Sequence, residues 1–383
     1  MRAAGQLVSL TVAAVLALPA ARAQGAREIP LDTGWTLAGE GTRIDTLRGE
    51  RAIVMQTGSA VRRDVSFENG EIEFDVALTA YRSFVYVKFR VQSDDELEEI
   101  YFRPHKTNLP DAVQYDPVWN GDTNWQLYHG DGGTVATPLS HSGWMHVRIV
   151  VEGKRAALFL DRATTPQMVM MLARNPAPGY VAFSSFSPQG AGLPGMPPAG
   201  AAAAAFRNLV VRPGPSSYSF AAVVTPAAVP GLVTRWQVSP PFEVSRGIVS
   251  TLPATLMDGR KQWSTYDVEP TGVLVIGRHV RRPAAQAAVV SRLVIPSATD
   301  GLRRLRLGYS DYVTVFVNGR PVFGGDAHYS FDAPRQDGVI GLYQATLWLP
   351  LRKGDNEVLF IVADGFGGWG LMGQLDAATV RAP

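Results

Sequence analysis

Apolar and polar residues alternate with a period of two along several segments in the first half of the chain. The segments are 70–78, 83–91, 98–105, 144–151, 155–160 and 179–186. Gly, Pro, Asn and Asp separate them, and the intervening stretches lack a convincing helical stripe of apolar residues. The pattern predicts antiparallel strands that turn one face to a core and the other to solvent.

The second half of the chain repeats this pattern. Alternating segments at 287–295, 302–308, 312–323, 346–351 and 357–363 predict further strands. Asn318-Gly319 lies between two apolar runs, and both residues tolerate the positive φ of a tight hairpin turn. Prolines cluster between the two halves. We therefore interpret 27–212 as one all-β domain, 213–233 as a linker and 234–383 as a second all-β domain.

The first residues have the features of a secretory signal peptide. Arg2 precedes a short apolar run at 7–18, and Ala21-Arg22-Ala23 matches a small-x-small cleavage site. We exclude 1–23 from the fold on this basis and expect a secreted or periplasmic protein. The rest of the sequence has no run of about 18 apolar residues, so we expect no transmembrane segment.

Charge and cysteine content exclude several classes of function. Removing Arg2 and Arg22 brings the 36 basic residues level with the 34 acidic residues. A near-neutral chain lacks the basic stripe that a nucleic-acid partner requires. The chain has no cysteine, which excludes a thiol nucleophile, a thiolate metal site and a Cys-linked lipid anchor.

Polar residues share one face of the predicted strands in the first domain. Glu71, Glu73 and Asp75 alternate with Ile72, Phe74 and Val76. Following segments place further polar side chains on a polar face in the same way. The candidate ligand-binding residues on that face are Tyr86, Arg90, Tyr101, Arg103, His105, Gln114, Gln126 and Tyr128. Hydrogen-bonding groups beside aromatic rings are what a poly- or oligosaccharide partner requires.

A structural interpretation of the acidic residues stays open. Antiparallel sheets often have one wet face, and Glu71, Glu73 and Asp75 could pair across strands with Lys88 and Arg90. For the stretch 111–130, alternation predicts two strands joined by a turn at 120–122. That register would place Trp119 and Trp125 in the core, and Gln126 and Tyr128 on the polar face near Arg103 and His105.

The first domain resembles a known family of secreted bacterial proteins. The segments "FENGEIEFDVAL", "FVYVKFRV", "YFRPH" and "DAVQYDPVWNGDTNWQLYHG" together resemble concanavalin A-like (laminin-G-like) sandwich domains. Within that group the order looks like the 3-keto-disaccharide hydrolase-like domains of sugar-degrading systems. The resemblance covers about 35–211 and implies an antiparallel β-sandwich with a carbohydrate-related role.

The resemblance also suggests a catalytic alternative. Laminarinase- and agarase-type sandwich enzymes carry alternating carboxylates on one strand, in the pattern E-x-D-x-E. The segment Glu71-Ile72-Glu73-Phe74-Asp75 is similar but has Glu in the middle and Asp at the end. Both departures change the reach of the acids, because a retaining pair needs carboxyl groups about 5–5.5 Å apart. A glycoside hydrolase using Glu71, Glu73 and Asp75 is the alternative to a binding protein, and an envelope module for structure or protein interaction is a third.

The sequence gives little indication of a metal site, a cofactor or another catalytic motif. Asn120, Asp122 and Asn124 resemble the start of a calcium loop, but Trp125 replaces the expected Gly and no Glu follows at position twelve. Calcium therefore stays unproven, and we expect no other metal and no cofactor. Hydrolase and phosphate-loop motifs are missing from the sequence, and His146 lies within a predicted strand, where a structural role is commoner.

The second domain resembles galactose-binding-like jelly rolls. The segments "VFVNGRPVF" and "LPLRKGDN" carry this resemblance, which covers about 234–376. Such domains accompany exported glycoside hydrolases, and many act as scaffolds. Where they bind sugar, the site lies on end loops, which makes Asp311, Tyr312 and Trp369 candidates. We thus predict a concanavalin A-like sandwich followed by a jelly roll, with glycan recognition in the first.

Overall fold

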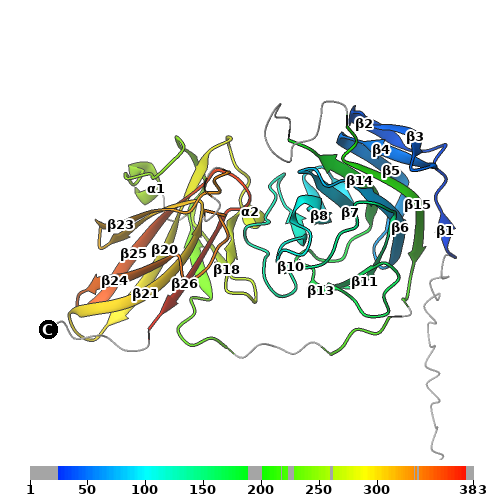
Figure 1. The fold of residues 1–383 in the computed structure, drawn as a ribbon. Coiled ribbons are helices and arrows are strands. Elements are labelled where there is room, and N and C mark those ends of the chain that lie inside the picture. The colour runs from blue at the N-terminus through cyan, green and yellow to red at the C-terminus, as the bar shows by residue number, and fades with distance from the viewer. Residues whose placement is uncertain are drawn as a thin grey trace, which may run out of the picture.

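The chain folds into four antiparallel sheets arranged as two sandwiches (Figure 1). The computed structural model describes residues 25–376 except 189–200, 217, 223–227, 259–261, 332, 334 and 335. The predicted signal peptide therefore lies outside the described residues. Within them, no helix is long and apolar enough to cross a membrane. The prediction of an all-β chain is confirmed.

Sheets A and B form the first sandwich. Sheet A has the strand order β13 (Met168–Met171), β12 (Arg155–Leu160), β11 (Met145–Glu152), β6 (Gly70–Leu78), β15 (Ala204–Pro213), β4 (Glu50–Met55) and β3 (Arg43–Leu47), and β1 (Arg27–Glu28) pairs with β15. Sheet B has the order β10 (Thr134–Val135), β9 (Val113–Val118), β8 (Glu96–Phe102), β7 (Phe84–Ser93), β14 (Gly179–Phe186), β5 (Thr57–Phe67) and β2 (Thr36–Glu40).

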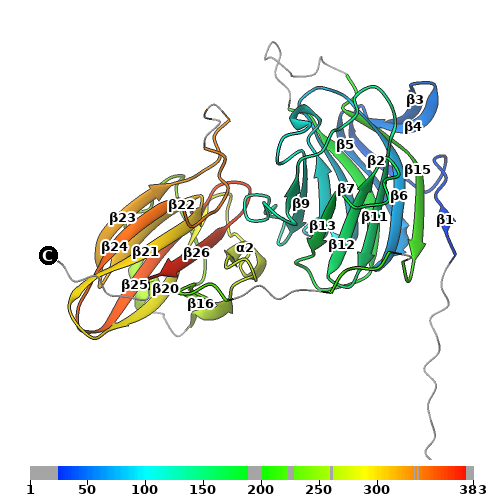
Figure 2. The ribbon, with the colours of Figure 1, turned by 60° about the horizontal axis from the view of Figure 1, so that its bottom comes forward.

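Sheets C and D form the second sandwich, which lies beside the first (Figures 1 and 2). Sheet C has the order β18 (Ser264–Asp267), β16 (Arg235–Val238), β20 (Ala287–Ser297), β25 (Gly354–Asp364), β22 (Tyr312–Val317) and β23 (Arg320–Asp326), and β17 (Phe242–Glu243) pairs with β20. Sheet D has the order β19 (Leu274–Val275), β26 (Gly370–Leu375), β21 (Gly301–Ser310) and β24 (Ala345–Leu351).

Helices are short in the described part of the chain. They are η1 (Pro104–Lys106), α1 (Ala254–Asp258) and α2 (Ile276–His279). The predicted segment 98–105 ends early, because the strand stops at Phe102 and Pro104 starts the 3-10 turn η1. The turn at Asn318-Gly319 forms as predicted, with φ values of 50° and 77°.

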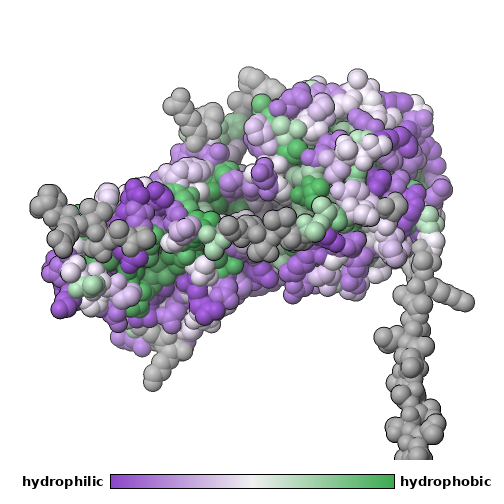
Figure 3. Space-filling model, turned by 90° about the horizontal axis from the view of Figure 1, so that it is seen from below, coloured by the Kyte–Doolittle hydropathy of each residue, from purple (hydrophilic) through white to green (hydrophobic). Residues whose placement is uncertain are grey.

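The period-two alternation places large apolar side chains between the sheets. Ile72 and Phe74 of β6 face Val85 and Val87 of β7 across one core, and all four are fully buried. A second core lies between sheets C and D and includes Phe360. At about 25 cal/mol per Å² of apolar surface, this burial is the main stabilising term of each sandwich. Seen from below, hydrophilic residues cover most of the first half, and apolar residues gather on the second half (Figure 3).

Parts of the predicted linker contact both halves. Tyr218 packs edge-on against Phe159 of β12, with ring centroids 5.2 Å apart. At the other end the backbone N–H of Val233 donates to the carbonyl of Gly373 at 2.8 Å. The division into domains at 213–233 stays a prediction, since the described linker residues are tied to a sheet at each end.

Candidate functional site

The three predicted catalytic carboxylates lie on the outer face of sheet A. Arg212 Nη1 contacts Glu73 Oε1 at 2.5 Å, and Arg148 Nε lies 3.5 Å from Glu71 Oε2. His146 contacts Asp75 through its Nδ1 at 2.9 Å. These partners come from β11 and β15, the strands that pair with β6. The acids are therefore matched by cationic or imidazole neighbours on their own sheet.

The predicted pairing of these acids with Lys88 and Arg90 is wrong. Strands β6 and β7 follow each other in sequence but join different sheets, with the apolar core between them. Lys88 instead lies 3.3 Å from Glu99 on sheet B. The acidic group and the polar aromatic group thus occupy opposite outer faces of the sandwich, and they do not form one site.

The outer face of sheet B carries the main cluster of candidate residues. Strand register places Tyr86, Tyr101 and Gln114 side by side on β7, β8 and β9. Tyr101 and Gln114 are each 2% exposed, whereas Tyr86 is half-buried. The rings of Tyr86 and Tyr101 lie 5.1 Å apart at 30°. Tyr86 therefore covers Tyr101 and Gln114, which together with Arg103 form a polar floor that has little contact with solvent.

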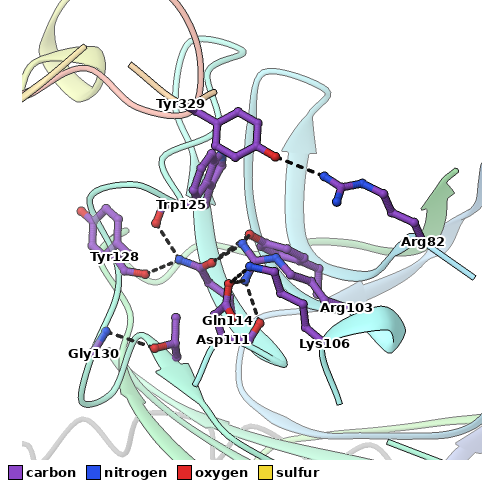
Figure 4. A network of polar contacts seen from close by, with 11 residues as sticks. Arg82, Arg103, Lys106, Asp111, Gln114, Trp125, Tyr128, Gly130 and Tyr329 are labelled. Carbon is purple, nitrogen blue, oxygen red and sulfur yellow. Dashed lines mark hydrogen bonds and ion pairs between the residues drawn. The ribbon is translucent and has the colours of Figure 1, made fainter. Parts of the chain in front are cut away.

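A hydrogen-bond network fixes that floor (Figure 4). Tyr101 and Arg103 both donate to Gln114 Oε1, at 2.9 and 2.6 Å. Gln114 Nε2 donates to the carbonyls of Trp125 and Tyr128 at 2.6 Å each. The guanidinium of Arg103 also lies 4.5 Å from the ring centroid of Tyr101. These contacts hold the loop after β9 against sheet B and use up the polar groups of Gln114.

A second row of charged side chains on the same face was not among the candidates predicted from the sequence. Lys88, Glu99 and Asp116 are register partners across β7, β8 and β9. Glu99 is 2% and Asp116 1% exposed. Burial raises the pKa of both carboxyls, the Glu99 charge raises the pKa of Asp116 further, and Lys88 opposes the rise at Glu99. Alternation in 98–102 and 113–118 indicates that each acid lies on the outer face. Only the register between the two strands brings the acids opposite each other.

His105 is held neutral at one end of this face. Its ring meets the ring of Phe84 edge-on, with centroids 5.4 Å apart. Both ring nitrogens are buried without a hydrogen-bond partner. Burial and, to a smaller extent, the charge of nearby Arg82 lower the pKa of His105 to about 4. The imidazole is therefore an uncharged aromatic neighbour of Phe84 at neutral pH.

Arg90 does not belong to the polar face. It adopts a positive φ of 50°, where the pairing of β7 with β8 shifts register. Its side chain is 1% exposed and donates to the carbonyls of Glu68 and Gly153 at 2.6 and 2.7 Å. Burial lowers the pKa of this guanidinium. Arg90 links two turns at the end of the sandwich, so its predicted place on the polar face is wrong.

Residues 124–128 do not form the predicted second strand. They run as a turn that contacts the second half of the chain. Gln126 accepts a hydrogen bond from Ser310 at 2.7 Å and is fully buried. Tyr128 packs on Tyr115, with ring centroids 5.6 Å apart. The predicted place of Gln126 and Tyr128 near Arg103 on the polar face is wrong, because contacts with the second half and the core override local alternation.

Trp125 also differs from its predicted place in the core. Its ring is only half-buried and lies 5.6 Å from Tyr329 and 6.1 Å from Phe366, both in the second half. The turn predicted at 120–122 does form, and Gly121 has a φ of 84°. Trp119 is 6% exposed and lies in the core as predicted.

The calcium-like residues serve the junction between the halves. Asn120 Nδ2 donates to the carbonyl of Gly277 at 2.9 Å, and Asp122 pairs with Arg282. Asn124 Nδ2 donates to the carbonyl of Pro117 at 3.0 Å. Among the described residues, no group of three or more His, Cys, Asp or Glu side chains could hold a metal ion.

The candidate residues predicted in the second half of the chain are buried. Asp311 is 1% and Tyr312 4% exposed, and Trp369 is fully buried. Asp311 Oδ2 accepts the backbone N–H groups of Gly365 and Phe366 at 2.8 Å, and Trp369 Nε1 donates to the carbonyl of Val362. These contacts give all three residues places in the packing rather than on an open loop. A hollow of about 370 Å³ nearby is lined in part by Tyr309, Asp326, Gln336, Tyr343 and Gln344.

Comparison with known proteins gives only distant likenesses. No family model and no curated protein matches the chain. The carbohydrate binding module CBM66 from Bacillus subtilis matches at 15% identity and a TM-score of 0.34, covering 47% of this chain and 96% of its own. A Bacillus licheniformis beta-glucanase matches at 14% identity and a TM-score of 0.37, covering 50% and 99%. Since both TM-scores lie below 0.5, the fold is assigned from the chain's own strand order.

Proposed function

We propose that this protein binds carbohydrate on the outer face of sheet B. The observation that carries the proposal is the row along β7, where Phe84, Tyr86 and Lys88 are all half-buried above a polar floor. Phe186 of β14 extends the row and is 49% exposed. Aromatic faces that stack on sugar C–H groups, beside a charged hydrogen-bond donor, are the elements of a sugar site.

The rigidity of the floor supports this function. Tyr101, Arg103 and Gln114 are held by one another and by the carbonyls of the loop after β9. Side chains that are already ordered lose little entropy when a ligand binds, so more of the contact energy appears as affinity. An exported location, as the N-terminal sequence predicts, forms part of the proposal.

Binding can be tested with soluble glycans and single substitutions. The mature protein is titrated with laminarin, xylan and galactan by calorimetry. Tyr86→Ala should lower the affinity for the glycan about fivefold, because one aromatic contact contributes about 1 kcal/mol. Trp348→Ala is the matched control, since Trp348 is 48% exposed on sheet D. If wild-type protein binds no glycan, an envelope module for structure or protein interaction is the better interpretation.

A second candidate function is glycoside hydrolysis by Glu99 and Asp116. Directly opposite residues on antiparallel strands have Cβ atoms about 4.5–5.5 Å apart, close to the carboxyl separation of about 5–5.5 Å in retaining glycosidases. Glu71, Glu73 and Asp75 are the other candidate acids, and Arg148, Arg212 and His146 engage them as Lys88 engages Glu99. Reducing sugar released from a bound glycan, lost in Glu99→Gln and retained in Glu73→Gln, would establish this second function.

A further inference from the structure

Six aromatic side chains form a band across both halves of the molecule, with Arg82 between its parts. The aromatic band consists of Phe186, Phe84, Phe331, Tyr329, Trp125 and Phe366. The first pair of rings lies 6.2 Å apart at 30°. The rings of Tyr329, Trp125 and Phe366 lie 5.6 to 6.2 Å from one another. Three members come from the first half and three from the second.

Arg82 joins the two parts of the aromatic band. Its guanidinium lies 5.7 Å from the ring centroid of Phe84 and 4.6 Å from that of Phe331. Its Nη2 also donates to the hydroxyl of Tyr329 at 3.1 Å (Figure 4). A cation between two aromatic faces is favourable at each contact. Arg82 therefore connects the rings on sheet B with the rings of the second half.

Both ends and the middle of the aromatic band reach the surface. Phe186 is 49%, Phe331 50% and Phe366 58% exposed. Exposed rings gathered in one band leave more apolar surface in water than scattered residues do, and such surfaces mark binding sites. Arg82 and the Tyr329 hydroxyl interrupt the apolar surface with hydrogen-bonding groups.

Buried contacts fix the two parts relative to each other. Besides the bond from Ser310, Gln126 donates its backbone N–H to the carbonyl of Gly367 at 3.0 Å. His129 Nε2 contacts the carbonyl of Ile340 at 2.8 Å. Leu127 packs in the same apolar cluster as Val275 and Met372 of the second half. The aromatic band is therefore part of one surface rather than two that meet by chance.

We propose that the aromatic band binds an extended glycan chain, with the second half supplying Phe331 and Phe366 as direct contacts. This inference rests on the proposed carbohydrate function of sheet B and extends it. A single sugar would occupy the row at Phe84 and Tyr86, whereas a longer chain would continue past Arg82 onto the second half. The second half is then part of the binding surface and not a scaffold alone.

The chemistry of the aromatic band favours a glycan over a hydrophobic partner. Its apolar atoms belong to flat rings, which stack on the C–H faces of sugar rings. Arg82 and Tyr329 provide polar groups between the rings, where the hydroxyls of a sugar chain can form hydrogen bonds. An aliphatic groove for a helix or a lipid chain would instead be lined by Leu, Ile or Val side chains.

A chain-length series tests this inference on the full-length mature protein. Calorimetry compares the disaccharide and the hexasaccharide derived from whichever of laminarin, xylan or galactan binds the wild type. Phe331→Ala and Phe366→Ala should each weaken hexasaccharide binding about threefold to tenfold and leave disaccharide binding unchanged. Trp348→Ala should change neither. Melting temperatures within a degree or so of wild type, about what a surface substitution produces, would exclude misfolding.

The outcomes separate the two proposals. Loss of affinity in Tyr86→Ala with wild-type hexasaccharide affinity in both Phe331→Ala and Phe366→Ala would overturn the inference and leave carbohydrate binding on sheet B intact. Equal affinity of wild type for disaccharide and hexasaccharide would overturn it as well. A wild-type protein that binds none of the probes would overturn both proposals.

Discussion

Ser310 and Gln126 join the two halves of the molecule through a buried hydrogen bond. Ser310 Oγ donates to Gln126 Oε1 at 2.7 Å, and both residues are fully buried. Gln126 lies in the stretch 111–130, which is rich in aromatic and amide side chains, and local alternation had placed Gln126 on an open polar face. The stretch instead forms the junction between the halves, and this placement brings Trp125 into the aromatic band.

Gln126→Ala should destabilise the protein by about 1–3 kcal/mol. The substitution removes the acceptor that Ser310 Oγ meets at 2.7 Å and leaves it only Asp311 Oδ1 at 3.2 Å, in a site that water does not reach. Chemical denaturation of the full chain measures the change. Gln262→Ala is the control, since Gln262 is exposed, and it should have almost no effect. An unchanged stability in Gln126→Ala would mean that the halves separate readily in solution.

Arg282→Ala should cost more than a typical surface arginine. Arg282 pairs with Asp122 of the first half and with Asp364 of the second, whose side chains are only 7% and 3% exposed. Removing one partner of a buried ion pair costs about 3–5 kcal/mol, because the remaining charge is uncompensated. Arg235→Ala breaks the exposed pair with Asp267, which contributes little to stability because water and salt screen the two charges. Similar losses in the two variants, measured by urea denaturation, would contradict the role of Arg282.

Glu98 should make the protein less stable as pH rises through the weakly acidic range. Burial raises the pKa of Glu98 from its ordinary 4.5 to about 7, although Tyr115 donates to it. Between these two values the unfolded chain releases a proton that the folded chain keeps, so the free energy of unfolding falls with rising pH. The loss approaches about 3 kcal/mol above the folded-state pKa.

Glu98→Gln tests this dependence. The Gln side chain cannot ionise, so the difference in stability between variant and wild type should move in favour of the variant as pH rises from 4.5 to 7. Thermal denaturation at several pH values measures it. His105 and His279 are unchanged in the variant and cancel in the comparison. A difference that stays constant with pH would show that Glu98 ionises in the fold at its ordinary pKa.

Glu99 and Asp116 should be energetically coupled. The two carboxyls face each other across β8 and β9, and ionising both places like charges side by side away from water. Asp116→Asn should therefore raise the melting temperature at neutral pH and change it little near pH 4, where Asp116 is protonated in the fold. A double-mutant cycle with Glu99→Gln measures the coupling directly. Additive effects of the two substitutions would refute the coupling and weaken the case for a catalytic pair.

Many strands could be predicted from the sequence because their signal is local. The segments predicted at 70–78, 155–160 and 179–186 match β6, β12 and β14. Side chains alternate in any extended chain, so an apolar–polar repeat reveals both the strand and the face that it buries. The turn at Asn318-Gly319 is local in the same sense, since it depends on the positive φ that its own two residues tolerate.

The candidate site was only partly predictable, because it depends on which strands become neighbours. Alternation correctly placed Tyr86 and Tyr101 on an outer face, yet it could not show that Glu73 lies on the opposite side of the sandwich. Consecutive strands β6 and β7 contribute to different sheets. The pairing of Glu99 with Asp116 likewise requires the register between β8 and β9, which the pattern of each strand alone does not contain.

Local sequence pattern was enough to predict the all-β class, the faces of most strands and the near-neutral charge. Tertiary structure alone decided that Gln126 and Trp125 lie at the junction, that Arg90 is buried between turns, and that Phe84 and Phe331 approach the same arginine. The physical reason is the range of the interactions. Backbone preference and alternation act between residues near in sequence, whereas the junction depends on contacts such as Gln126 with Ser310, which are 184 residues apart.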